Sequence, residues 1–178
     1  MTRQVGLLRG INVGARNRVA MAQLRELMEA LGYTGVETLL QSGNVVFGSK
    51  EPAATSERRI AKRLHDETGL DIKVLVRTRA ELAAVVKRNP LGKVATEPKR
   101  YQVSFLEKKL PAKTLKELEA VAAPSERVAA HGRELYAWHP AGVARSKLWA
   151  KLAGKGLGVT ATARNWTTVE ALLELADG

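Results

Sequence analysis

The sequence has 178 residues, of which 45% are hydrophobic and 26% are charged, a composition typical of a globular protein with a buried core. It contains no cysteine, which excludes disulfides, thiol nucleophiles, iron–sulfur clusters and zinc sites built on thiolates. Lys and Arg number 29 against 18 Asp and Glu, a formal net charge of +11, and this excess favours an anionic partner.

The N-terminal apolar segment, Val5 to Ile11, contains Arg9 and has no small-residue cleavage site. We therefore do not expect a signal peptide. No apolar run approaches the roughly 20 residues that span a bilayer, so we expect no membrane-spanning segment. Together these features predict a cytoplasmic protein, and they do not indicate its oligomeric state.

The first 77 residues alternate between strand and helix patterns. Short apolar or alternating segments predict strands at 4–11, 35–40, 44–47 and 72–76. Apolar residues at helical spacing predict helices at 21–31 and from Pro52 to Gly69. The resulting order, β-α-β-β-α-β, is that of the ferredoxin-like fold.

The second half repeats most of this order. A capping box at 78–81 predicts a helix that ends before Pro90, and the stretch 91–98 is the predicted linker. Further patterns predict a strand at 101–105, a helix at 114–124, a hairpin at 126–139 and helices at 145–152 and 166–176. We therefore expect an α+β protein with two ferredoxin-like halves and mainly antiparallel sheets, at 1–77 and 99–178, joined by a helix and linker at 78–98.

The segment from Arg9 to Arg18 joins the first predicted strand to the first predicted helix and is cationic and glycine-spaced. Backbone N–H groups at the helix start, together with Arg9, Arg16 and Arg18, favour the binding of an anion such as phosphate. The Walker A and GxGxxG patterns are missing. The alternative is a surface turn whose glycines relieve backbone strain.

The tetrapeptide from Gln41 to Asn44 is a predicted hairpin turn. In a ferredoxin-like half, this hairpin and the loop after the first strand leave the sheet at the same end. Polar side chains of both segments are therefore expected to converge on one concave surface, namely Arg9, Asn12, Arg16, Asn17, Gln41, Ser42 and Asn44. Taken alone, the turn sequence equally fits a hairpin that binds nothing.

A third candidate lies near the C-terminus. Thr167 and Glu170 match a capping box, which places Arg164 and Asn165 just before a helix N-terminus, a position suited to anions. We expect these two residues to bind an anion as well. Whether they belong to the same cleft as the N-terminal loops is left open by the sequence.

Six segments closely resemble a bacterial family called domain of unknown function 1697, and they extend over nearly the whole chain. They are residues 7–14, 21–24, 41–47, 132–136, 146–148 and 162–169. The resemblance implies an α+β fold with a ferredoxin-like portion. It brings no established reaction, substrate or catalytic residue.

Two classes of function remain open. The first is the binding of a phosphate-bearing or other anionic small molecule in a cleft formed by the 9–18 loop and the 41–44 hairpin. If this site is catalytic, hydrolysis of a phosphate or acyl-phosphate group fits it, by analogy with the Arg-bearing loop after the first strand of acylphosphatases. The two loops contain no His, Asp or Glu to act as a general base, and no pattern indicates a metal or cofactor.

The second class is a basic nucleic-acid-binding module in the C-terminal half. Residues 77–178 carry a net charge of +8 against +3 for residues 1–76. Lys147, Lys151 and Lys155 recur every four residues, a pattern that fits a phosphate-contacting stripe or a solvated helix face. Alternation places Tyr136 and Trp138 on one strand face, either as a stacking surface for bases or as part of a core.

Overall fold

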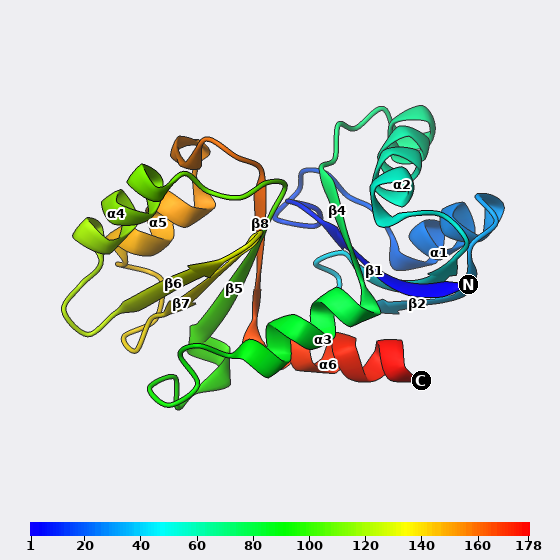
Figure 1. The fold of residues 1–178 in the computed structure, drawn as a ribbon. Coiled ribbons are helices and arrows are strands. Elements are labelled where there is room, and N and C mark those ends of the chain that lie inside the picture. The colour runs from blue at the N-terminus through cyan, green and yellow to red at the C-terminus, as the bar shows by residue number, and fades with distance from the viewer. The chain divides into compact units, whose positions relative to one another are not determined.

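Two four-stranded sheets form the framework of the chain (Figure 1). The structure is a computed structural model and describes all 178 residues apart from the side chain of Lys155. The chain divides into two units: unit 1 comprises Met1–Ala84 and Ala171–Gly178, and unit 2 comprises Val85–Glu170. The predicted stripe of Lys147, Lys151 and Lys155 therefore lies partly outside the described side chains.

Unit 1 has the β-α-β-β-α-β order that the sequence predicts. Its elements are β1 (Thr2–Leu8), α1 (Met21–Ala30), β2 (Thr34–Leu39), β3 (Asn44–Ser49), α2 (Ala53–Thr68) and β4 (Val74–Thr78). The strand order is β2-β3-β1-β4, and every neighbouring pair is antiparallel. The predicted helix after β4 is α3 (Arg79–Arg88).

Unit 2 has the same topology. It contains the 3-10 turn η1 (Pro98–Arg100), β5 (Tyr101–Leu106), α4 (Ala112–Val121), β6 (Arg127–His131), β7 (Glu134–Trp138), α5 (Lys147–Ala153), the 3-10 turn η2 (Lys155–Leu157) and β8 (Ala161–Asn165), and α6 (Trp166–Asp177) follows. The strand order is β6-β7-β5-β8, again with antiparallel neighbours. The chain is therefore an α+β protein with two ferredoxin-like halves.

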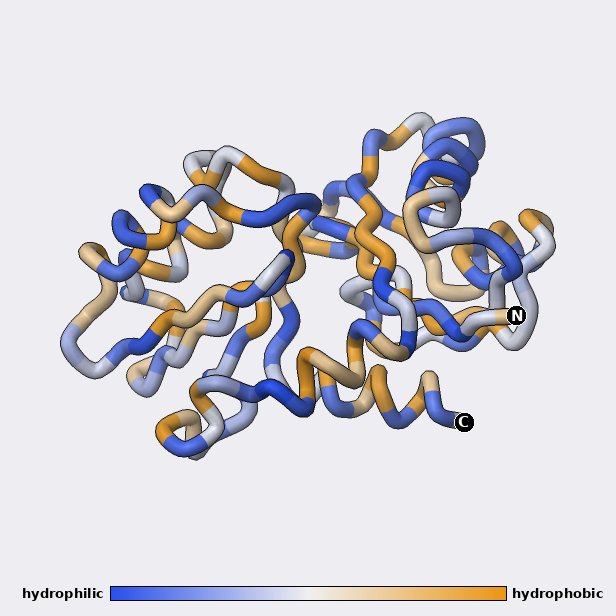
Figure 2. Tube along the Cα trace, viewed as in Figure 1, coloured by the Kyte–Doolittle hydropathy of each residue, from blue (hydrophilic) through white to orange (hydrophobic). Residues whose placement is uncertain are grey.

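The core of unit 1 forms where α1 and α2 pack on one face of the sheet. Leu24 of α1 and Ile60 of α2 are fully buried in one cluster with Phe47 of β3. In both helices the apolar residues recur at helical spacing, so that one apolar stripe of each helix faces the sheet. Figure 2 shows the complementary pattern, with hydrophilic residues along much of α2 and apolar residues on the strands.

The sequence predicts no strand between the last two helices of the second half, and this prediction is wrong. Residues 161–165 form β8, which pairs with β5 through Val103 and Arg164. The segment contains Ala, Arg and Asn, which are not typical strand residues, so its local propensity is weak. Pairing with the central strand β5 determines its conformation.

An aromatic cluster fills part of unit 2. The rings of Tyr101 and Trp166 stack with centroids 4.8 Å apart, and the Tyr136 hydroxyl donates to the Val85 carbonyl at 3.0 Å. Tyr136 and Trp138 are buried, so they belong to the core and do not present a stacking surface for bases.

Within the described part of the chain, no helix is both long and apolar enough to cross a membrane.

Burial raises the pKa of Tyr101 to about 12, and burial is also the main cause that raises the pKa values of Tyr33 and Tyr136. A raised pKa stabilises the fold below the ordinary tyrosine value of about 10 and loses this contribution as the pH rises through the native value. We expect the tyrosine absorbance of the native protein to stay flat past about pH 10, followed by alkaline unfolding. Early ionisation of all three tyrosines without unfolding would contradict this.

Candidate functional site

The loop after β1 and the β2–β3 hairpin lie against each other at one end of the unit 1 sheet. Leu7 pairs with Asn44, and the Leu8 N–H donates to the Gly43 carbonyl at 2.8 Å. A Cβ at Gly43 would lie 2.7 Å from the Ile11 side chain and 2.8 Å from that of Leu8. Glycine is required there both for this close approach and for its φ of +89°.

The side chain of Asn12 joins the two segments. Its Nδ2 donates to the carbonyl of Gln41 at 2.7 Å and to that of Val19 at 2.9 Å. Its Oδ1 accepts from the Val19 N–H at 2.9 Å. Asn12 has a φ of 55°, a left-handed conformation that asparagine tolerates better than most residues. One amide thus holds the end of the 9–18 loop and the hairpin turn together.

The central part of the 9–18 loop is itself an ordered small hairpin. The Asn12 N–H donates to the Asn17 carbonyl at 3.0 Å, and Val13 pairs with Arg16 in an isolated antiparallel bridge. The Asn17 side chain is exposed and donates to the Gly10 carbonyl at 3.2 Å. Asn12 and Asn17 therefore shape the loop, a role that the sequence did not distinguish from ligand contact.

Asn44, expected to contact a ligand, is completely buried and engaged within the hairpin. Its Nδ2 donates to the Leu39 carbonyl at 2.8 Å and to the Ser42 Oγ at 3.0 Å, which fixes the hairpin turn. Gln41 and Ser42 are exposed. Leu40 lies between them and β2 with a φ of 61°, a strained conformation for a bulky residue.

Three arginines border these loops. Arg16 and Arg18 are exposed and Arg9 is half-buried. In the part of the chain that the structure describes, no carboxylate lies within 4.0 Å of any of their guanidinium groups. Val13 is 72% exposed and Leu40 59% exposed. The surface therefore combines unpaired positive charge with two apolar side chains on a rigid support.

Arg164 and Asn165, the third predicted anion site, both make hydrogen bonds within unit 2. Arg164 is a buried residue of β8 that donates to Thr162 Oγ1 at 2.8 Å and to the Ala163 carbonyl at 2.9 Å, and burial lowers its pKa to about 10. Asn165 Oδ1 accepts from the Thr168 N–H at 2.9 Å. Because α6 begins at Trp166, Asn165 caps this helix in place of the predicted capping box.

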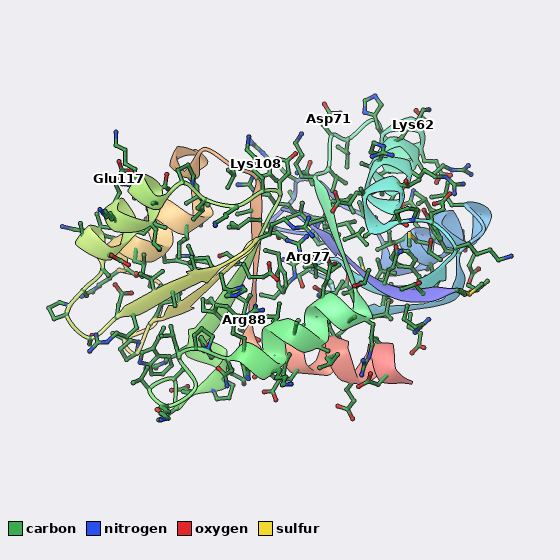
Figure 3. All side chains as sticks on the ribbon, in the orientation of Figure 1. Lys62, Asp71, Arg77, Arg88, Lys108 and Glu117 are labelled. Atoms are coloured by element: carbon green, nitrogen blue, oxygen red, sulfur yellow. The ribbon has the colours of Figure 1, made fainter. Side chains whose placement is uncertain are left out.

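The last strand of unit 1 carries a buried arginine at the corresponding position. Arg77 is 1% exposed and is labelled in Figure 3. It pairs with Val5 in β1, just as Arg164 pairs with Val103 in β5. Each arginine also donates to the carbonyl of the residue before it. Sequence analysis did not identify this pair, because the repeat is visible only once β8 is recognised.

Unit 2 contains a polar cluster that the sequence reasoning missed. Glu126 Oε2 lies 2.6 Å from His139 Nδ1 and accepts from Ser146 Oγ at 2.6 Å. Glu126 Oε1 accepts from the Ala123 N–H at 2.9 Å, and Ser146 caps α5 by accepting from the Trp149 N–H. Glu126 and His139 are the first and last residues of the predicted hairpin and Ser146 lies at the start of the next predicted helix, so the sequence places them near one another but gives no signal that their side chains meet.

This cluster does not have the geometry of a hydrolytic triad. Ser146 Oγ lies 3.3 Å from His139 Nδ1, the same ring nitrogen that contacts Glu126. A proton relay needs the hydroxyl on one ring nitrogen and the carboxylate on the other. Among the described residues, no group of three metal-ligating side chains is present either. The cluster therefore ties three segments of unit 2 together.

Comparison with known proteins identifies the family. A family model described as "Protein of unknown function (DUF1697)" matches residues 1–136, and the chain belongs to this family. A solved structure of a conserved bacterial protein, SP0830 from Streptococcus pneumoniae, is similar with a TM-score of 0.80 and 21% identity over 98% of each chain, which shows the fold. No curated protein matches the chain significantly.

Replacing Asn12 tests its role as the connector. Asn12→Gly permits the left-handed backbone but removes three hydrogen bonds, and we expect it to lower the free energy of unfolding by about 1–3 kcal/mol in urea titrations. Asn12→Ala should cost about 1 kcal/mol more because of its Cβ. Asn17→Gly is the matched control, with one exposed hydrogen bond to lose. Equal losses for Asn12→Gly and Asn17→Gly would contradict the assignment.

Burial alone raises the pKa of Glu126, but hydrogen bonds from Ser146, the Ala123 N–H and His139 outweigh it and hold the pKa below its ordinary value. The stabilisation is therefore present above the ordinary carboxyl pKa of about 4.3 and lost as the pH falls through the lower native value. Glu126→Gln should lose about 1.5–3 kcal/mol at neutral pH and reduce the acid sensitivity of unfolding. Unchanged acid sensitivity would overturn this assignment.

Proposed function

For this member of the DUF1697 family, we propose that the paired 9–18 and 40–44 loops bind a small ligand that carries a phosphate group. The observation that carries this proposal is a rigid loop pair with three arginines that face no carboxylate among the described side chains. Arg16 and Arg18 are exposed and Arg9 is half-buried, so all three are accessible to a ligand from solvent. An anionic ligand supplies the missing charge.

The surrounding groups complement such a ligand. Ala20, the N-cap of α1, provides no side-chain acceptor to the first turn, and that turn contains no acidic residue. Its free N–H groups and its positive dipole end therefore support an anion at the end of the loop. The exposed side chains of Gln41 and Ser42 offer hydrogen bonds to polar substituents. The hydrogen bonds of Asn12 to Val19 and Gln41 hold the segment just before α1 and the hairpin turn next to each other.

A conformationally fixed loop loses little entropy when it binds. The hydrogen bonds of Asn12 and Asn17 and the buried Asn44 restrict both segments before any ligand arrives. Leu40 retains a strained backbone at the same place, a feature that accumulates at functional sites. We assign a binding role to these loops and no catalytic step, because the groups present supply charge and hydrogen bonds.

Binding of nucleic acid through unit 2 is less well supported. The aromatic side chains that would stack on bases, Tyr136 and Trp138, are buried. Stacking of single-stranded nucleic acid requires accessible aromatic faces. The positive charge of the chain still attracts polynucleotides without specificity, so the test of the proposal includes an RNA.

The test compares thermal stability with inorganic phosphate, ATP and a short single-stranded RNA at about 50 and 200 mM salt. A ligand at a hundredfold excess over its dissociation constant stabilises the fold by about 2.7 kcal/mol. We expect phosphate or ATP to stabilise the wild type. Arg9→Ala/Arg16→Ala should weaken that binding at least about tenfold.

The matched control is Lys50→Ala/Arg58→Ala. It removes the same charge from exposed residues of unit 1, and Lys50 follows β3 at the opposite end of the strand from the loop pair. This variant should bind within about twofold of the wild type, a difference of only a few tenths of a kcal/mol. A shift with RNA alone, retained by both double variants, would reject the loop site.

A further inference from the structure

A cavity of about 700 Å³ opens in unit 2 beside the Glu126 cluster. Its wall comes from the end of α4, the connection from α4 to β6, and the segment from β7 to α5. This volume is within the range of small-molecule sites, about 300–1,000 Å³. All of the lining residues belong to unit 2, so none of the residues of the 9–18 and 40–44 loops lines the cavity.

The Glu126 cluster forms the cavity in advance of any ligand. Glu126 is provided by the α4–β6 connection, His139 by the end of β7 and Ser146 by the residue before α5. His139 Nδ1 and Ser146 Oγ each lie 2.6 Å from Glu126 Oε2, and His139 is completely buried. Because the three segments that bound the cavity are tied at this point, the cavity does not need to be opened by binding.

The lining combines two kinds of surface. Val121, Ala123 and Ala144 are apolar, whereas Arg145 and Lys147 contribute exposed cations. Neither cation has a carboxylate within 4.0 Å among the side chains that are described. Glu126 also lines the cavity, and its carboxylate is charged, with both oxygens engaged by Ala123, His139 and Ser146. Two cations against one carboxylate leave the cavity lining with a net charge of +1, and the two cations, unlike Glu126, have no ionic partner within 4.0 Å among the described side chains.

We propose that this cavity is a second ligand site, which binds a small organic anion with its carboxylate or phosphate head at Arg145 and Lys147 and its apolar body against Val121 and Ala144. Charge-assisted hydrogen bonds orient the head group, and burial of the apolar body against the alanine and valine side chains adds affinity. The Ser125 hydroxyl, which also lines the cavity, offers a further hydrogen bond.

The test titrates the full chain with benzoate, phenyl phosphate and the uncharged benzyl alcohol, followed by amide chemical shifts. We expect saturable shifts at Ser125, Gly142 and Lys147, with at least about tenfold weaker binding of benzyl alcohol. A preference between benzoate and phenyl phosphate identifies the head group. Arg145→Ala/Lys147→Ala should abolish the preference for anions, and Ala144→Leu, which places a larger side chain on the wall that contacts the apolar body, should weaken the binding of all three probes.

The matched control is Lys108→Ala/Lys109→Ala. These exposed lysines follow β5, and Lys108 is labelled in Figure 3. Since the start of β5 pairs with Trp138 next to His139, they lie at the other end of the strand, and the control should bind like the wild type. Absence of saturable shifts with both anions, shifts that map elsewhere, or equal loss in both double variants would overturn the proposal.

Discussion

The amide of Asn12 is the interaction on which the candidate surface of unit 1 depends. Its Nδ2 donates across 29 residues of sequence to the Gln41 carbonyl, while its Nδ2 and Oδ1 together hold the backbone of Val19, seven residues further along the chain. A backbone hydrogen bond alone would join the two strands but leave the long loop after β1 free. With the amide in place, the arginines of that loop and the hairpin turn become one surface.

The end of the first strand is joined to the hairpin of the sheet in the same way in both units. The units differ in the length of the connection that follows this strand. Leu8 N–H donates to Gly43 in unit 1, and Leu106 N–H donates to Arg133 in unit 2, each at 2.8 Å. The next segment, however, runs from Arg9 to Ala20 in unit 1 and only from Glu107 to Pro111 in unit 2. The five-residue connection of unit 2 shows that this topology does not require the longer segment of unit 1.

Most of the fold was predictable from the sequence because helices and strands here follow clear hydrophobic periods. The failure at β8 has a physical cause, since Ala161 to Asn165 has little strand propensity and forms a strand by pairing with β5. The convergence of the two loops was predictable for a different reason. It follows from topology, which needs only the order of the elements and the antiparallel arrangement of β1 and β3.

The roles of individual polar residues were not predictable, because a side-chain amide suits a ligand and a backbone carbonyl equally well. Asn44 and Arg164 are buried and Asn165 caps a helix, so three of the residues expected to bind an anion stabilise the fold. The Glu126 cluster shows the converse case, in which tertiary structure assembles distant residues of ordinary local sequence. Burial identifies the structural role of Asn44, whereas the role of the exposed Asn17 follows only from its hydrogen bond to the Gly10 carbonyl. Arg16, Gln41 and Ser42 remain on the surface, and Asn44 fixes the turn beneath them.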